Sequence, residues 1–413
     1  MPSPEPTARE ASAPRQVVLF LQGPVSPFYT ELADFLEERG HRALRINLSF
    51  GDWLFWRRGG ATDYRGTRLD WASFIADFVD REGVTDIVMN GGHRFYHKVA
   101  IAAARARGVR VYATDFGYLR PDWLTFERDG MSGDSRFPRD AEGIWALAEG
   151  APSIDNQVLY PERFLDEVLR DMSYHISTML MGWRYPGYRS HLPTNPLLVY
   201  IGTGLHLLRA KRTAPKVDAL VARLRAEKVP YWILPLQLEK DFQLREYSPY
   251  RDMKTPMQEV IRSFAANAPR EARLLIKVHP LDPGLRNWPR MVRRAAQKWG
   301  IADRVDFLDG GMLAKALEGT RGVVTINSTV GIWALRAGIP VVTLGAAIFD
   351  IEGLTFQGPL DRFWAEGRQP DLPLADAFVR AMAVDTQIRG GLFSPKGVAA
   401  AVRAAATRIE ERR

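Results

Sequence analysis

Residues 323–331 read Val-Val-Thr-Ile-Asn-Ser-Thr-Val-Gly, and this stretch decides the fold. Its first four residues are apolar or β-branched, which is typical of a buried strand. The polar residues Asn327, Ser328 and Thr329 end that strand, and an apolar-periodic helix is expected from 330 to 337. Hydroxyls and backbone N–H groups at such a strand-to-helix turn can hold an anion.

A second stretch, residues 274–280, follows the same plan. It reads Leu-Leu-Ile-Lys-Val-His-Pro, so a buried strand ends in Lys277 and His279, and Pro280 prevents the strand ladder from continuing. In an open parallel sheet, ligands bind outside the carboxyl ends of the strands. Both stretches can therefore face one phosphate, and the pattern favours a nucleotide sugar as the ligand.

Apolar strands alternate with helical patterns along the rest of the chain, as in βαβ units. The expected strands are 17–21, 43–47, 86–89 and 109–114 in the first half, and 197–201, 231–235, 273–278, 305–308, 323–326 and 340–344 in the second. This alternation predicts an α/β protein of the GT-B type, with two Rossmann-like domains whose parallel sheets face a central cleft.

The expected domain boundaries follow changes in composition. Residues 1–15 are rich in Pro, Ser and Glu and are interpreted as a disordered tail, and 16–183 as the N-terminal Rossmann-like domain. Residues 184–196 contain three prolines and no apolar periodicity, which is typical of a linker. The C-terminal Rossmann-like domain then spans 197–385, and 386–413 form a C-terminal helical segment.

Composition excludes several classes of site. The chain has 413 residues, 46% of them apolar, which is enough for two cores at roughly 150 residues per domain. It contains no cysteine, so disulfides, zinc-thiolate sites, iron–sulfur clusters and thiol nucleophiles are excluded. Neither a signal peptide nor an apolar stretch of membrane-spanning length is expected.

The charge balance indicates that the binding partners are anionic. The formal net charge is +8, which suits phosphate-bearing substrates, nucleic acid or an acidic lipid surface. A nucleic-acid partner is not expected, because the arginines are dispersed and no recognised binding module is present. Neither half has the glycine pattern of a dinucleotide site or a Walker A sequence, and Gly202-Thr203-Gly204 after the expected strand 197–201 is a weak candidate for substrate contact.

Longer runs of sequence resemble a known family, the capsule polysaccharide biosynthesis proteins of the KpsS/LipB type, which are related to the Kdo-transferase modules of KpsC. The resemblance covers nearly the whole chain after the tail. It is carried by FLQGPVSPF (20–28), GDWLFWRR (51–58), FGYLRPDWLTFER (116–128), PLQLEKDFQLREYSP (235–249), KVHP (277–280), INSTVGIWALRAGIPVVTLG (326–345) and IFDIEGLTFQGPL (348–360).

The resemblance implies a specific activity. It implies a retaining β-Kdo glycosyltransferase that transfers Kdo from CMP-Kdo to a phosphatidylglycerol-type lipid and so begins the poly-Kdo linker of a capsule. Such an enzyme would be cytoplasmic and peripheral to the inner face of the cytoplasmic membrane, beside a KpsC-like transferase and the capsule export machinery. No cofactor and no metal are expected, since the carboxylates lack metal-type spacing and the histidines are scattered.

Candidate donor-binding residues come from both decisive stretches and from one polar loop. Loss of CMP leaves growing charge on its phosphate, which fixed cationic and N–H donors stabilise. The candidates for CMP-sugar binding are Lys277, His279, Pro280, Asn327, Ser328, Thr329, Gly202, Thr203, Gln237 and Asp241. Gln243 and Ser248 extend the polar loop that could hold cytidine or ribose.

Retention suggests two displacements through a covalent glycosyl-enzyme, which requires a carboxylate nucleophile. Asp115 is the first candidate, because it follows the expected strand 109–114, and Arg120 could bind the Kdo carboxylate. KpsC-like modules have an acidic pair before Gly-Phe-x-Arg, whereas Phe116 stands at the second position here. Glu127 and Asp122 are therefore alternative nucleophiles.

The acceptor side is predicted from loops of the first half. His93, with Arg94 and Tyr96, follows the expected strand 86–89 and could act as acid/base or bind sugar hydroxyls, and Gln22 and Gly23 occupy the equivalent place after the first strand. The segment 50–58 concentrates aromatic and basic side chains. Within it, Trp53, Trp56 and Arg57 suit a lipid headgroup interface or a lid over the cleft.

Other functions share parts of this pattern. A nucleotide-sugar epimerase or a sialyltransferase-like enzyme would keep the fold and the phosphate site. A catalytically silent partner of the capsule assembly would keep the fold and lose the nucleophile. Measured turnover separates these alternatives.

Overall fold

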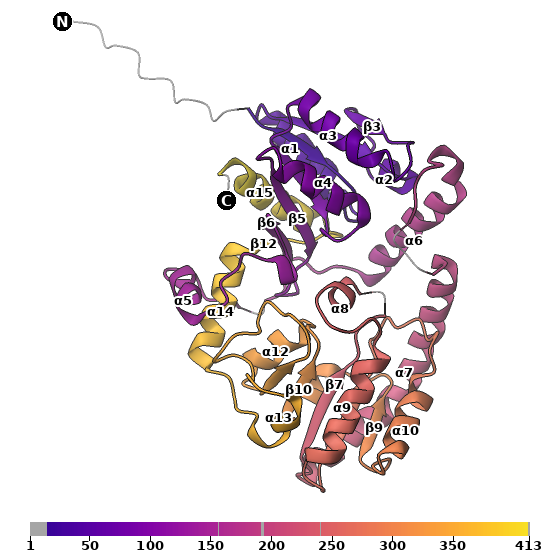
Figure 1. The fold of residues 1–413 in the computed structure, drawn as a ribbon, viewed down its shortest axis with the longest axis vertical. Helices are drawn as coiled ribbons and strands as arrows, with labels where there is room; N and C mark the ends of the chain where they lie inside the picture. The colour runs from indigo at the N-terminus through magenta and orange to yellow at the C-terminus, as the bar shows by residue number, and fades with distance from the viewer. Residues whose placement is uncertain (1–14, 156, 191–193, 240, 412–413) are drawn as a thin grey trace, which may run out of the picture.

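Two β-sheets, each flanked by helices, form two halves of the molecule (Figure 1). The structure, a computed structural model, describes residues 15–155, 157–190, 194–239 and 241–411. Strand order is β12-β6-β5-β4-β1-β2-β3 in one sheet and β11-β10-β7-β8-β9 in the other. The predicted fold class, an α/β protein with two largely parallel sheets, is confirmed. The predicted tail lies outside the described residues except for Arg15.

The first sheet has a parallel centre and an antiparallel edge. Its parallel strands are β1 (Val17–Phe20), β2 (Arg42–Asn47), β3 (Ala61–Asp63), β4 (Asp86–Asn90) and β5 (Arg110–Phe116), and its antiparallel strands are β6 (Trp123–Arg128) and β12 (Gln387–Arg389). The helices of this half are α1 (Phe28–Glu38), α2 (Phe50–Leu54), α3 (Trp71–Glu82), α4 (Phe95–Arg105) and α15 (Pro395–Glu410), with α6 (Phe164–Leu180) beside α2.

The second sheet is parallel throughout. Its strands are β7 (Tyr231–Pro235), β8 (Arg273–Lys277), β9 (Val305–Leu308), β10 (Gly322–Thr325) and β11 (Val341–Thr343). The helices around it are α7 (Pro196–Ala226), α8 (Phe242–Glu246), α9 (Lys254–Asn267), α10 (Trp288–Lys298), α11 (Leu313–Leu317), α12 (Val330–Arg336), α13 (Leu360–Glu366) and α14 (Leu372–Asp385). Because β7 and β8 run in register and β10 lies on the other side of β7, the loops after these strands open at the same edge.

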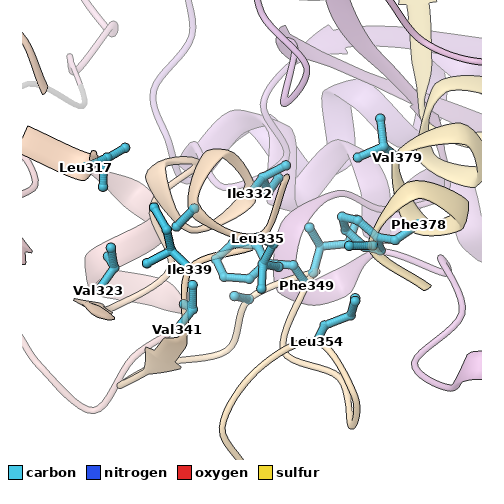
Figure 2. Close-up of a cluster of buried hydrophobic side chains, with 14 of the residues drawn as sticks. Leu317, Val323, Ile332, Leu335, Ile339, Val341, Phe349, Leu354, Phe378 and Val379 are labelled. Carbon is cyan, nitrogen blue, oxygen red and sulfur yellow. The ribbon is translucent and has the colours of Figure 1, made fainter. Parts of the chain in front are cut away.

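The core of the second half fixes the turn after β10. Ile332 and Leu335 of α12 pack with Phe349 and with Phe378 of α14 (Figure 2). A Cβ at Gly331 would lie 2.4 Å from the Phe349 ring, so only glycine allows this approach. The polar residues 327–329 are therefore held between a buried strand and a tightly packed helix.

The chain passes between the halves several times. Helix α5 (Ala141–Ala148) follows β6 in sequence but packs on α14, and its Ile144 belongs to the core of the second half. After α14, the chain returns to the first sheet as β12, and α15 packs on α1. The carbonyl of Ile409 accepts a hydrogen bond of 2.9 Å from Gln16 Nε2, which ties the end of α15 to the first strand.

The strand expected at 197–201 is wrong, because these residues open the long helix α7. Asn195 caps the helix by accepting the Leu197 amide at 3.0 Å, and Pro196 occupies the first turn, where a missing N–H costs nothing. Residues 197–201 are uniformly apolar, so their pattern does not distinguish a strand from a helix. The helix expected at 330–337 and the strand expected at 231–235 are confirmed.

None of the described helices is long and apolar enough to cross a lipid bilayer.

Candidate active site

Asp115 lies near the end of β5, at the junction of the two halves. Its Oδ1 accepts the Phe116 amide at 2.7 Å, and its Oδ2 has no hydrogen-bond partner among the described residues. Burial raises the pKa of Asp115, while the Phe116 amide and the charges of Arg120, Arg94 and His93 lower it. One carboxylate oxygen is thus anchored and the other is free to react.

Arg120 stands on the turn between β5 and β6. Its Nε donates to the Gly117 carbonyl at 3.2 Å, and its guanidinium lies 4.4 Å from the centre of the Phe116 ring. Water reaches the side chain, although enough protein surrounds it that burial lowers its pKa, against the raising effect of Asp115. The residue that replaces the second acid, Phe116, therefore supports the arginine with its ring.

Asp241 brings a second carboxylate from the other half. It caps α8 by accepting the Gln243 amide at 2.9 Å. Burial raises its pKa, and Asp115 raises it further while Arg120 lowers it. Asp115, Arg120 and Asp241 therefore form one electrostatic group across the junction, although they lie far apart in sequence.

His279 presents a neutral N–H donor. Its Nδ1 accepts the Leu281 amide at 3.1 Å, which leaves the proton on Nε2. Burial lowers the pKa of His279 to about 4, and Arg120 is among the charges that act on it. The imidazole is thus uncharged at neutral pH and lies within electrostatic reach of the Asp115 group.

Lys277 is buried and hydrogen-bonded to a neighbouring loop. It is 5% exposed, and its Nζ donates to the Gly310 carbonyl at 2.7 Å. Burial lowers its pKa, while Asp309 and Asp218 raise it. The ammonium therefore holds the loop after β9, and its contact with a phosphate stays a prediction.

The residues after β10 divide into anchors and a free hydroxyl. Asn327 is buried and forms two hydrogen bonds with Gln237. Its side-chain Oδ1 accepts Gln237 Nε2 at 3.0 Å, and its backbone N–H donates to Gln237 Oε1 at 3.3 Å. The Ser328 hydroxyl accepts the Val330 amide at 3.3 Å. Thr329 begins α12 without a side-chain cap bond, so its hydroxyl has no partner among the described residues. Asn327 and Gln237 therefore fix the turn after β10, and Ser328 and Thr329 stand partly exposed at the start of α12.

Gly202 and Thr203 do not form a phosphate loop, because both lie within α7. A Cβ at Gly202 would lie 2.1 Å from the Pro283 carbonyl oxygen, and Thr203 Oγ1 donates to the Leu281 carbonyl at 3.5 Å. The two residues let α7 approach the loop that follows His279 and Pro280. Their contribution is to position the histidine.

A cross-junction clamp escaped the sequence analysis. The Tyr247 hydroxyl lies 2.8 Å from His93 Nε2 and donates to Asp134 Oδ2 at 2.9 Å. Gln243 Nε2 donates to the Ser132 hydroxyl, and Gly133 leaves room for the Tyr247 ring, which a Cβ would meet at 2.1 Å. A cavity of about 220 Å³ beside this clamp is lined in part by His93, Ala113 and Asp134. The signal available in the sequence was the polar loop that contains Gln243 and Ser248; the Ser248 hydroxyl itself bonds the Leu244 carbonyl.

Several predicted acceptor residues pack or form hydrogen bonds within the protein. Gln22 is 1% exposed and donates to Asp52 Oδ2 at 3.2 Å and to the Tyr174 hydroxyl at 3.0 Å. Gly23 packs beneath the Tyr29 ring, which a Cβ would meet at 2.5 Å. Tyr96 is buried, stacks on Tyr188, and its hydroxyl accepts the Arg189 amide at 3.3 Å.

The aromatic segment 50–58 is split between core and surface. Trp56 is 2% exposed, with its ring 5.4 Å from Phe20 and the Arg45 and Arg58 guanidiniums near its faces. A lipid-facing role for Trp56 is therefore wrong. Trp53 is 38% exposed, and Arg57 lines a cavity of about 470 Å³ with Arg170 of α6.

Neither alternative nucleophile is placed for attack. Asp122 accepts the Leu159 and Tyr160 amides, the latter at 3.1 Å, and so anchors a turn. Glu127 lies in β6 with both carboxylate oxygens buried and without a partner among the described residues, and burial raises its pKa to about 8. A protonated carboxyl at neutral pH is a poor nucleophile, so Asp115 is the remaining candidate.

Comparison with known proteins places the chain in a family. The model of the capsule polysaccharide biosynthesis protein family matches residues 85–393. The protein belongs to this family. The capsule polysaccharide export protein KpsS of Escherichia coli is 31% identical over 90% of this chain and 95% of its own length. The capsule polysaccharide modification protein LipB of Neisseria meningitidis serogroup B is 28% identical over 91% of both chains.

Among solved structures, KpsC of Thermosulfurimonas dismutans, a beta Kdo 2,7 transferase, aligns over 95% of this chain and 99% of its own with 15% identity and a TM-score of 0.46. The predicted family membership is thus confirmed by sequence. In this capsule biosynthesis protein, the match from 85 to 393 includes Asp115, Arg120, His279 and residues 327–329. Among the described residues no three His, Asp or Glu side chains are grouped as metal ligands, and the roles of individual site residues stay predictions.

Proposed function

We propose that this capsule biosynthesis protein is a retaining β-Kdo transferase that uses CMP-Kdo and a phosphatidylglycerol-type lipid acceptor. One observation carries the proposal. Asp115 has one oxygen anchored by the Phe116 amide and the other free, beside Arg120 and opposite Asp241. A carboxylate held in this way is the group that a double displacement requires.

In the first step, the free oxygen of Asp115 attacks the anomeric carbon of the bound sugar. The bond from that carbon to the CMP phosphate breaks, and its electron pair leaves with CMP. His279 Nε2–H and the hydroxyls of Ser328 and Thr329 would donate to the departing phosphate. Arg120 would hold the sugar carboxylate, since a guanidinium can form two parallel bonds to it.

In the second step, a hydroxyl of the acceptor attacks the same carbon from the side that CMP has vacated. The bond to Asp115 breaks, the carboxylate is restored, and the hydroxyl loses its proton. Two inversions give net retention. His93 is the candidate base, since it acts electrostatically on Asp115 and burial lowers its pKa, which favours a neutral ring that can accept a proton.

The test is mass spectrometry of a lipid acceptor after incubation with purified protein and CMP-Kdo generated in situ. We expect a gain of one Kdo unit, lost in Asp115→Asn and His279→Ala proteins and kept in His175→Ala, a partly buried histidine of α6 that the mechanism does not use. A covalent sugar adduct on wild-type protein after a short reaction would support the double displacement directly.

The other outcomes identify the alternatives. CMP-Kdo that protects the protein against heat without product formation would indicate another acceptor or a silent capsule-assembly partner. If CMP-Kdo gives neither protection nor product but a different CMP-sugar gives both, that CMP-sugar is the donor. A change in the sugar without transfer would indicate an epimerase.

A further inference from the structure

Two helices carry a continuous row of apolar side chains on their outer face. On α6 and the turn after it, the exposed members are Leu165, Leu169, Met179, Leu180 and Trp183; on α7 they are Leu198, Ile201, Leu205 and Leu208. We call these nine residues the α6–α7 ridge. Eight of them are more than half exposed, Trp183 most of all at 72%. A soluble protein rarely leaves such a row uncovered.

The spacing places each row on one side of its helix. Residues 198, 201, 205 and 208 recur at intervals of three and four, and so lie along one face of α7. On α6, the row lies opposite Tyr174, the buried residue of that helix. Figure 1 shows α6 and α7 following each other along one side of the molecule, across both halves.

The charge beside the ridge favours an anionic surface. From Pro196 to Lys216 the chain has no acidic residue, whereas Arg209, Lys211, Arg212 and Lys216 follow the apolar row of α7. Lys211 and Arg212 are exposed and have no ion-pair partner among the described residues. An apolar helix face next to lysines and arginines is typical of a helix that lies in a membrane interface.

Cations also flank the row on α6. Arg170 lies one residue after Leu169 and, with Arg57, lines the cavity of about 470 Å³ whose other walls include Pro27, Leu54 and Phe55. Neither guanidinium has an ion-pair partner among the described residues. Two such guanidiniums beside apolar walls suit a phosphate ester that carries a hydrocarbon chain.

The inner face of α6 joins the ridge to the candidate active site. Tyr174 donates to Asp52 Oδ1 at 3.0 Å, and Glu167 acts electrostatically on Arg120. We propose that the α6–α7 ridge is the surface on which this protein lies against an anionic phospholipid membrane. The role of this surface in the reaction rests on the proposed lipid acceptor, but membrane binding by the ridge can be tested without measuring turnover.

A second copy of the chain fits the α6–α7 ridge less well than an anionic membrane does. A twofold interface places the same patch of each copy against the other, so the basic runs at 209–216 would face like charge. An anionic bilayer complements those runs and accepts aliphatic side chains and a tryptophan at its boundary.

The experiment is co-sedimentation of the full-length protein with phosphatidylglycerol or phosphatidylcholine vesicles, without any sugar donor. We expect preferential binding to phosphatidylglycerol, reduced on the order of tenfold or more in the double variant Ile201→Glu/Leu205→Glu. Leu69→Glu is the matched control, since Leu69 is an apolar residue of the first half that is 92% exposed. Lys211→Ala and Arg212→Ala should each weaken binding on the order of fivefold at low salt.

A second readout is quenching of tryptophan fluorescence by brominated phosphatidylglycerol, which Trp183→Phe should largely remove. Wild-type binding that shows no lipid preference, or that survives Ile201→Glu/Leu205→Glu, would overturn the proposal. A wild-type dimer that the double variant converts to monomer would also overturn it, because the ridge would then be a self-association interface.

Transfer assays with a short-chain, soluble acceptor separate this proposal from the proposed function. The double variant should keep that activity, because its substitutions lie on the outer face of α7. Vesicle binding without any transfer would contradict the proposed transferase activity and support the membrane-binding surface. Transfer without vesicle binding would support the transferase activity and contradict the membrane-binding surface.

Discussion

Asp115 is the residue on which the proposed chemistry depends, and its burial also allows a prediction about the stability of the Asp115→Asn variant. Asp115→Asn should lower transfer on the order of 10⁴-fold, because the amide cannot form the glycosyl-enzyme. Its melting temperature at neutral pH should not fall, since burial disfavours the carboxylate charge that the variant removes. Kinetics and differential scanning calorimetry on the same samples check both parts. A large drop in melting temperature would instead make Asp115 a structural anchor.

Glu127 offers a test of burial by titration. Its pKa is raised from 4.5 to about 8, so between these values the folded state keeps a proton that the unfolded state has lost. The stability that this proton contributes is complete below pH 4.5 and is lost as pH rises through 8, at about 1.4 kcal/mol per pH unit.

Glu127→Gln lacks this proton uptake. The difference in melting temperature, variant minus wild type, should therefore grow from pH 5 to pH 8 and then level off. A difference that stays flat over that interval would contradict a protonated Glu127.

At the scale of elements, α7 contains a matched pair of glycines. Gly202→Ala would drive a Cβ into the Pro283 carbonyl and shift the loop that carries His279, whereas a Cβ at Gly204 would meet no atom within 4 Å. Gly202→Ala should therefore lower stability and weaken donor binding, while Gly204→Ala should leave donor binding unchanged and stabilise the helix by about 0.5–1 kcal/mol. Donor KM and chemical denaturation distinguish the two. Equal behaviour of both variants would remove the positioning role of Gly202.

The segment around α2 gives a second pair. Trp56→Ala should cost about 3–5 kcal/mol of unfolding free energy, because it empties a core site beside Phe20. Trp53→Ala, on a side chain that is 38% exposed, should cost less than about 1 kcal/mol. Urea denaturation followed by circular dichroism measures both. Similar costs for the two would show that Trp56 is not the packed residue of the segment.

The elements also show what the sequence could and could not predict. Strands such as β7 and β8 were predictable because short apolar runs ended in Pro235 and in the Lys-x-His-Pro turn. Residues 197–201 are equally apolar, but they form the first turns of a long helix that Asn195 caps, and this context outweighed β propensity. Strand β6 has a period-2 pattern in Leu124 and Phe126, yet its pairing with the edge strand β12 joins residues about 260 positions apart and has no local signal.

The site followed the same division. Asp115, Asp241 and His279 were predictable as candidates because each lies at or after the carboxyl end of a strand, and Arg120 because it follows Asp115 on the next turn; their approach across two different sheets was not. The hydrogen bond from Lys277 to the loop after β9 could not be predicted, because it depends on how that loop packs against the end of β8. The neutral state of His279 was also hidden, because it arises from burial and from the Leu281 amide.

At the scale of the whole molecule, the two halves share too much chain to unfold separately. Helix α5 lies in the core of the second half although it follows β6, and β12 and α15 complete the first half although they follow α14. Loss of either core therefore removes elements that the other half needs to stay connected. We expect one calorimetric transition with equal van't Hoff and calorimetric enthalpies. Two resolved transitions would show that the halves are independent.

The charge state of the candidate donor site has a consequence for turnover. A nucleotide phosphate carries more negative charge after its glycosidic bond breaks than before. Because His279 is neutral and the Lys277 ammonium is committed to Gly310, the site meets that phosphate mainly with uncharged N–H and hydroxyl groups. If the donor is a CMP-sugar, as proposed, such a site would not hold the spent nucleotide by full positive charge. We therefore expect the product to depart readily and free CMP to be a weak inhibitor in a competition assay.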